Sequence, residues 1–182
     1  MNDLLLLRRS PTSNALFSIR PITRADDKVI AGWLAAMPGS TDKNSILTQL
    51  RSSRENTDSS QLFHTLIGTL HEKPLFFASV QKDVHGADDL LCQGLYNDYK
   101  LYVLLALGVR ISQLATRAWQ AATSYLFAQP DVHRVLAEIL DMDIEENDAV
   151  TRLGFRQAMT ISSFAGKINC YCCSKDNFTP VI

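Results

Sequence analysis

One stretch of the sequence, from Tyr99 to Phe155, constrains the fold more than any other. It begins with an apolar run of strand character at 99–107 and continues through a polar loop into a helical pattern over 116–127. A second strand is predicted at 133–138, and the short helix after it ends at Leu153-Gly-Phe155. Strand, loop, helix and strand in this order present backbone N–H groups at a helix start, where a pyrophosphate binds well.

Length and charge set the broad class of protein. A chain of 182 residues predicts one domain with a full hydrophobic core. The net charge of −1 gives no surplus of cations for a nucleic acid. The apolar run near the N-terminus has only four residues, at 4–7, and no run approaches the roughly 20 that a membrane helix needs. We therefore expect a cytoplasmic protein with no nucleic-acid or membrane partner.

Four cysteines, Cys92, Cys170, Cys172 and Cys173, suggest a metal site at first sight. A structural zinc site needs four ligands, usually in two separated pairs, and this cluster does not provide them. Neighbouring residues of a strand point to opposite faces, so Cys172 and Cys173 are expected to diverge. We expect no metal, and reduced thiols on a C-terminal strand.

The remaining pattern predicts a mixed fold. We expect a loose leader over 1–14 and a single domain over 15–182. Thr23 or Asp26 is expected to cap the first helix, and Pro38-Gly39 to end it. The element order is β-α-α-β-β-β-α-β-α-β-β, which indicates an α+β domain with a mixed, mostly antiparallel sheet flanked by helices. The strands are expected at 15–22, 62–70, 74–81, 99–107, 132–138, 157–165 and 167–174, and a second helix at 43–54.

Short pieces of sequence within this order resemble one family. Thr116-Arg-Ala-Trp119, Arg134-Val-Leu-Ala-Glu138 and Gly154-Phe155 follow one another as in the hydroxamate-siderophore acyltransferases of the GNAT superfamily. That group includes the aerobactin hydroxylysine acetyltransferase and mycobactin lysine acyltransferase types. The resemblance covers roughly residues 15–178. It implies a GNAT fold and an acyl-CoA-dependent N-acyltransferase of siderophore biosynthesis, acting on a small amine or N-hydroxylated amine.

The resemblance also implies where acetyl-CoA or another acyl-CoA binds. Superfamily members hold the pyrophosphate with Arg/Gln-x-x-Gly-x-Gly/Ala, and the nearest match here is Gln113-Leu-Ala-Thr-Arg-Ala118. Thr116 stands at the glycine position, where it can instead cap the helix. The cofactor-binding residues expected from the resemblance are Leu105, Leu107, Arg110, Gln113, Ala115, Thr116, Arg117 and Ala118.

The expected catalytic residues depart from the family pattern. Tyr102 stands where the siderophore group carries a histidine, and a tyrosine donates a proton more readily than it accepts one at neutral pH. Glu138 matches the family's glutamate, and Asp141 is the nearest substitute for an acidic residue that the mycobactin type places one position earlier. We therefore expect Tyr102, Glu138 and Asp141 to form the catalytic set.

Two residues are candidates for the acceptor site. Trp33 lies on the first predicted helix, the region with which the superfamily walls its acceptor, and His85 lies in the polar segment 82–98. Trp119, by contrast, is expected to pack in the core. Two alternatives stay open: a degenerate member of the fold that binds a ligand or partner without catalysis, and an acetyltransferase of another acceptor class. The chain is expected to be a monomer or a homodimer.

Overall fold

The structure is a computed structural model of the whole chain. It describes residues 5–7, 17–36, 63–70, 72–83, 98–106, 113–164 and 166–180. Leu107, Arg110, His85 and the helix expected at 43–54 lie outside the described residues.

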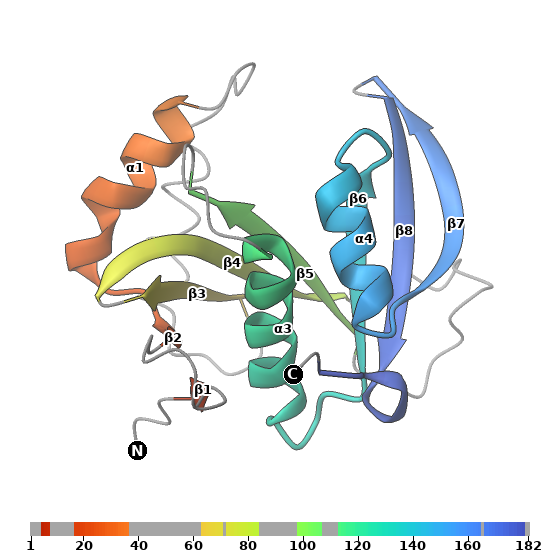
Figure 1. Cartoon of the computed structure of the whole chain (residues 1–182), viewed down its shortest axis with the longest axis horizontal. Helices are drawn as coiled ribbons and strands as arrows, with labels where there is room; N and C mark the ends of the chain where they lie inside the picture. The colour runs from red at the N-terminus through yellow and green to blue at the C-terminus, as the bar shows by residue number, and fades with distance from the viewer. Residues whose placement is uncertain are drawn as a thin grey trace.

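One sheet of eight strands organises the fold, in the spatial order β1-β2-β3-β4-β5-β6-β8-β7 (Figure 1). The described helices lie beside this sheet, so the expected mixed α+β class is confirmed. The strands are β1 (Leu5–Leu7), β2 (Phe17–Pro21), β3 (Phe63–Leu70), β4 (Lys73–Asp83), β5 (Asp98–Leu105), β6 (Arg134–Leu140), β7 (Arg156–Ser163) and β8 (Gly166–Ser174).

All neighbouring strands but one pair run antiparallel. The exception is β5 and β6, which pair in parallel from Asp98 opposite Arg134 to Leu101 opposite Ala137. A parallel pair needs a crossover connection, and α3 (Leu114–Phe127) provides it. The stretch from Tyr99 to Phe155 therefore contains the crossover unit of this fold.

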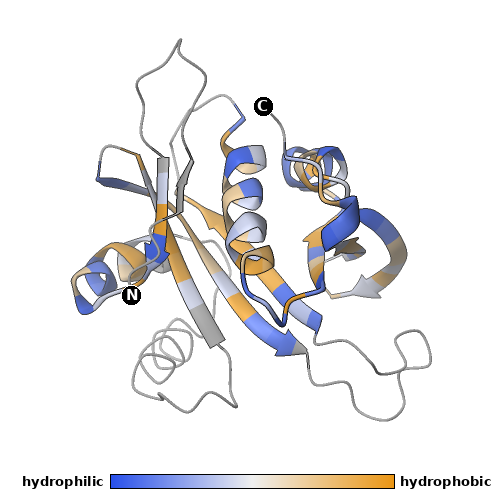
Figure 2. Ribbon diagram, turned by 90° about the horizontal axis from the view of Figure 1, so that it is seen from below, coloured by the Kyte–Doolittle hydropathy of each residue, from blue (hydrophilic) through white to orange (hydrophobic). Residues whose placement is uncertain are grey.

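Two helices cover one face of the sheet. α3 and α4 (Ile144–Arg152) pack on the face that carries Tyr99 and Leu101 of β5 and Val135 of β6. We call this the helix face. Its core includes Trp119 and the alanines of α3, and Figure 2 shows the strands beside α3 as largely hydrophobic. Trp119 is 1% exposed, which confirms its expected place in the core.

On the opposite face, the helices that the structure describes cover only part of the sheet. α1 (Asp27–Ala36) follows the short 3-10 helix η1 (Arg24–Asp26) and packs against Ile67 of β3 and Phe77 of β4. Both strands are consequently buried on both sides. β6 buries only the alternate residues that face α3 and α4, and every residue of β7 is exposed. The sheet thus has one covered half and one half that the described helices cover on a single face.

An ion pair and a capping box fix η1, the 3-10 turn that leads into α1. Arg20 on β2 donates to both carboxylate oxygens of Asp26, at 2.7 and 2.8 Å, and the Thr23 amide donates to the same carboxylate at 2.7 Å. These bonds, the Arg20 hydrogen bond first, lower the pKa of Asp26 to about 2. Thr23 and Asp26 therefore form the helix start as a capping box, as their positions in the sequence indicated.

Two strands differ from the expected element map. Leu5–Leu7 forms β1 and pairs with Phe17–Ile19, although no element was expected before residue 15. β6 continues two residues beyond Glu138, because Ile139 and Leu140 pair with Asn169 and Ile168 on β8. The end of the last helix is as expected: Gly154 has φ +91°, and a side chain there would meet the Asn177 carbonyl oxygen at 2.0 Å.

Candidate active site

The parallel strands β5 and β6 separate at a defined point. Their pairing ends at Leu101 and Ala137, while β5 continues to Leu105 and β6 to Leu140. Figure 1 shows the two strands diverging beyond this point, beside the start of α3. The Asp98–Arg134 ion pair closes the narrow end, with Nε to Oδ1 at 2.7 Å and a second, shorter contact from Nη2 to Oδ2. The opening between the strands therefore begins at the next residues, Tyr102 and Glu138.

Tyr102 and Glu138 come together at this opening. The Tyr102 hydroxyl donates to Glu138 Oε2 at 3.4 Å, and Lys100 Nζ lies 3.1 Å from Glu138 Oε1. The Tyr102 contact is at the long end of the hydrogen-bond range, and the tyrosine is 38% exposed. A weakly held hydroxyl beside a carboxylate can turn to a ligand that enters between the strands. The structure thus brings together two of the three residues expected to be catalytic.

Trp33 lies on the same side of the sheet as Tyr102. Its ring stacks on Phe77 with centroids 6.3 Å apart and planes 8° apart. Phe77 pairs with Leu104, and two residues along each strand Ser79 pairs with Tyr102. Residues two apart on a strand share a face. Trp33 therefore forms part of the apolar surface on one side of the opening.

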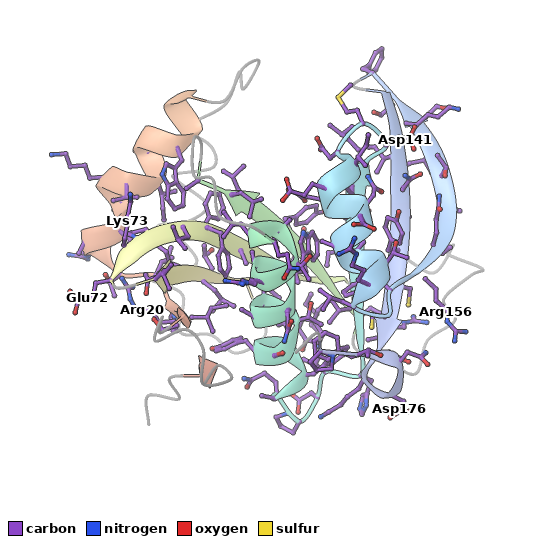
Figure 3. The ribbon with its side chains drawn as sticks, viewed as in Figure 1. Arg20, Glu72, Lys73, Asp141, Arg156 and Asp176 are labelled. Carbon is purple, nitrogen blue, oxygen red and sulfur yellow. The ribbon has the colours of Figure 1, made fainter. Side chains whose placement is uncertain are left out.

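Asp141 lies apart from these residues, although it was expected to join them. Its carboxylate accepts a hydrogen bond from Asn169 Nδ2 at 3.1 Å, and Asn169 is buried on the helix face. Figure 3 shows Asp141 at the upper end of β6, before α4. Asp141 lies three residues after Glu138, an odd spacing that puts the two side chains on opposite faces of the sheet. Asp141 therefore has a hydrogen-bond partner on the helix face, and its carboxylate does not lie with Tyr102 and Glu138 at the opening.

The Asp141 side chain belongs to a polar network on the helix face. Asn147 of α4 is its centre: Nδ2 donates to the carbonyl oxygens of Leu140 and Asp143 at 2.8 and 2.9 Å. Asn147 Oδ1 accepts from Tyr171 at 2.7 Å and from Asn169 at 3.0 Å. This network fixes the end of β6 against α4 and β8, and so fixes the position of one strand of the opening.

The start of α3 offers backbone donors near the opening. Gln113 adopts a left-handed conformation (φ 62°, ψ 26°) as N-cap, and its carbonyl accepts from the Arg117 amide at 3.0 Å. The amides of residues 114–116 have no acceptor four residues back within the helix. They and the positive end of the helix suit an anionic group.

Thr116 is not the cap of this helix, contrary to the expectation. The helix begins two residues earlier than its sequence pattern indicated, so Thr116 is its third residue and is only 8% exposed. Ala115 and Ala118 are fully buried in the core, and Leu105 packs against it. Leu105, Ala115, Thr116 and Ala118 can therefore offer a cofactor mainly their backbone atoms. Of the other described residues expected to bind it, Gln113 is exposed and Arg117 is half-buried.

One ionisable group between α3 and α4 was missed by the sequence analysis. Trp119 Nε1 donates to Glu146 Oε2 at 3.3 Å. Burial raises the pKa of Glu146 to about 7, with further contributions from the nearby Asp143 and Glu145 carboxylates. In the sequence, Glu145-Glu146 reads as an ordinary acidic first turn. No local pattern reveals that the second glutamate faces a buried tryptophan.

The described residues offer no cluster of three or more His, Cys, Asp or Glu side chains suited to a metal. Cys172 and Cys173 diverge as the strand geometry predicts: Cys173 is buried in the core of the helix face, and Cys172 pairs with Leu136 on the other face. Within the described ranges, no helix is both long and apolar enough to cross a membrane.

Comparison with known proteins gives a clear answer for the fold. No family model and no curated protein matches the sequence. The solved structures that match include the aminoglycoside acetyltransferase AAC(6')-Ib with ribostamycin and coenzyme A, at 15% identity and a TM-score of 0.69, covering 88% of this chain and 94% of that one. RimJ of Mycobacterium smegmatis in complex with CoA-disulfide matches at 14% identity with a TM-score of 0.68. The match covers 88% of this chain and 83% of that one.

A third match is the ribosomal-protein-S5-alanine acetyltransferase of Vibrio fischeri. Its identity is 13% and its TM-score 0.66, covering 90% of this chain and 96% of that one. The chain therefore has the fold of the GNAT acetyltransferases. Identities this low establish the fold alone, and the activity is argued below from the site.

Proposed function

We propose that this protein is an acyl-CoA-dependent N-acyltransferase that acts on an amine or an N-hydroxylated amine, as the siderophore-biosynthesis acetyltransferases do. The observation that carries the proposal is the opening between β5 and β6. It begins at Tyr102 and Glu138, and the start of α3 lies beside it. Structures of this fold hold coenzyme A, as the AAC(6')-Ib and RimJ complexes show for those proteins.

The residues present fit an acyl-CoA. The amides of residues 114–116 and the positive end of α3 suit the pyrophosphate, and Arg117 adds a charge on the same turn. Strands that separate expose main-chain groups that can hold the pantetheine arm in extended form. The thioester supplies an activated acyl group when it is bound there.

The chain's own side chains then have distinct tasks. The amine nitrogen forms a bond to the thioester carbon, the carbon–sulfur bond breaks, and the nitrogen proton has to leave. In this proposal Glu138 accepts that proton, and its ion pair with Lys100 holds the carboxylate in position. The Tyr102 hydroxyl donates to the developing oxyanion or to the departing thiolate. Holding both reactants in one opening supplies much of the remaining acceleration.

The test has two stages. Calorimetric titration with acetyl-CoA measures binding, and release of free thiol across a panel of amines and hydroxylamines measures turnover. Binding with turnover supports the proposal. Binding without turnover of any acceptor favours a degenerate member of the fold that keeps a ligand site. Absence of acyl-CoA binding would overturn the transferase function altogether.

A further inference from the structure

The half of the sheet beyond β5 has an apolar face on the side of Tyr102. The strand register places Glu138, Cys170 and Met159 in one row and Leu140, Ile168 and Ile161 in the next. We call these six residues, with Tyr102, the open face. Met159 and Ile161 are 43% and 41% exposed, and Leu140, Ile168 and Cys170 are half-buried. The described helices α3 and α4 lie on the opposite side, so these apolar side chains need another explanation.

The open face continues the proposed reaction site. Glu138 belongs to its first row, and Tyr102 lies across the opening between β5 and β6. On the other side of Tyr102, the same face carries Leu104, Phe77 and the stacked Trp33. The hydroxyl and carboxylate proposed for the chemistry therefore lie between two apolar surfaces.

The described carboxylates on this side of β5 to β8 already have cationic partners. Among the described residues of β5 to β8 that point to the open face, the carboxylates are Asp98 and Glu138, and each is paired with a cation, Arg134 and Lys100. Arg156 points to the same face at the start of β7 and adds positive charge. An acceptor with several ammonium groups needs several carboxylates for recognition. Its positive charges are unfavourable once they lose water, unless negative charges on the protein lie opposite them. The described part of this face is therefore a weaker match for a polycation than for an acceptor with an apolar body.

We propose that the acceptor of this chain is a monoamine, or its N-hydroxylated form, with an extended apolar body that lies on the open face. The reacting nitrogen lies at Tyr102 and Glu138, and the apolar body extends over Cys170, Met159 and Ile161 toward β7. This inference rests on the proposed function and names the substrate class for that site. It differs from the chemistry of ribostamycin or kanamycin, which are bound by the structurally similar AAC(6')-Ib.

The experiment measures acceptor binding directly, so that it does not depend on turnover. Butylamine, hexylamine and octylamine are titrated calorimetrically into the protein saturated with coenzyme A, which carries no acyl group to transfer, with kanamycin as the polycationic comparison. Each buried methylene is expected to tighten binding about two- to fourfold, since burying a CH₂ is favourable. Octylamine is therefore expected to bind at least tenfold more tightly than butylamine, and more tightly than kanamycin.

Two matched variants locate the apolar body. Ile161→Gln removes apolar surface from the open face, whereas Ser162→Gln places the same side chain on the other face of the same exposed strand. Both positions are exposed, so the fold is expected to survive either change. Ile161→Gln should weaken octylamine binding about fivefold and leave butylamine unchanged, and Ser162→Gln should alter neither.

The outcomes separate the two proposals. Affinity that is flat with chain length, tighter binding of kanamycin, or an unchanged octylamine affinity in Ile161→Gln would overturn the apolar acceptor site. Chain-length-dependent binding that Ile161→Gln weakens, with no thiol released from any acyl-CoA, would support the site and refute the transferase.

Discussion

The two faces of the sheet at the β5–β6 opening are built differently. On the helix face, Asn147, Asn169 and Tyr171 join in a network of bonds between 2.7 and 3.1 Å, enclosed by α4 and β8. On the open face, Tyr102 and Glu138 meet at 3.4 Å and are partly exposed. The helix face holds its polar groups in fixed positions, and the open face keeps similar groups accessible.

This difference shows how one sheet can stabilise the fold on one face and carry the candidate active site on the other. A buried network is costly to break, because each lost partner leaves a desolvated group behind. A weak, exposed contact costs little to exchange for a ligand. We therefore expect changes on the helix face to alter mainly the free energy of unfolding, and changes on the open face to alter mainly turnover.

The largest effect is expected at Tyr102. Tyr102→Phe removes the hydroxyl and keeps the ring, so the rate of acyl transfer should fall about 10²- to 10³-fold, the usual cost of losing one oxyanion donor. The measurement is steady-state thiol release, with acetyl-CoA affinity followed by calorimetry as the control. Equal turnover by the variant and the natural protein would exclude a catalytic role for this hydroxyl.

Asn147→Ala should produce the largest loss of stability on the helix face. It removes four hydrogen bonds and leaves the Tyr171 hydroxyl and two carbonyl groups without this partner. We expect a decrease of about 3 kcal/mol in the free energy of unfolding, measured by urea denaturation. Asp148→Ala, which breaks only the exposed pair with Arg152 on the same helix, is the control and should cost about 0.5 kcal/mol or less.

Glu146 provides a pH-dependent test of the helix face. Its folded-state pKa is raised to about 7 from the ordinary 4.5, so the folded protein binds the proton more tightly than the unfolded chain does. Ionisation thus costs stability increasingly as pH rises from about 4.5 to 7, and the full cost remains above 7.

Glu146→Gln avoids that ionisation and still offers an oxygen to Trp119. It should stabilise the protein at pH 8 on the order of 3 kcal/mol, and by little below pH 4.5. Unfolding curves at both pH values measure this difference. A stabilisation that does not vary with pH would contradict the assignment of the pKa to Glu146.

Arg117→Glu tests the start of α3 as the pyrophosphate site. Removing a cation that pairs with phosphate and adding an anion should weaken acetyl-CoA binding by about 2 kcal/mol, measured by calorimetry. Arg152→Glu makes the same charge change on α4 and serves as the control. Equal affinities in Arg117→Glu and the natural protein would place the pyrophosphate elsewhere.

The smallest effect is expected at Thr123, a polar residue of α3 that is buried in the hydrophobic core. Its hydroxyl is fully buried and has no hydrogen-bond partner among the described residues. Thr123→Val keeps the shape and removes the unsatisfied group, so it should raise stability by about 1 kcal/mol. Thermal unfolding measures the change; a loss of stability would show that the hydroxyl does have a partner.

Much of the fold could be predicted from local sequence. Each described strand that was expected forms within about two residues of its predicted place, and so does the helix after the crossover loop, because alternation and helical spacing leave a clear pattern. The residues at which helices and strands begin and end were harder to predict. β6 gains two residues from pairing with β8, and α3 begins at Leu114 because Gln113 adopts a left-handed conformation. Neither cause is visible in a local window.

The candidate site was predictable to a similar degree. Tyr102, Glu138 and Trp33 were expected from resemblance, and strand register brings them to one face of the sheet. Asp141 follows Glu138 by three residues, and this odd spacing directs its side chain to the other face of the sheet. Glu146 was missed because its partner Trp119 lies 27 residues away in the sequence.

By itself, the sequence determined most of the described elements and their order, with β1 the exception, since hydrophobic periodicity and helix-ending residues act over a few positions. It also determined which chemical groups lie near the end of each element. Only the tertiary structure decided which of those groups meet. Strand register, the point where β5 and β6 separate, and the burial of one face by α3 and α4 depend on contacts between distant segments. Those contacts made one glutamate a partner of Tyr102 at the opening and another a half-buried partner of Trp119.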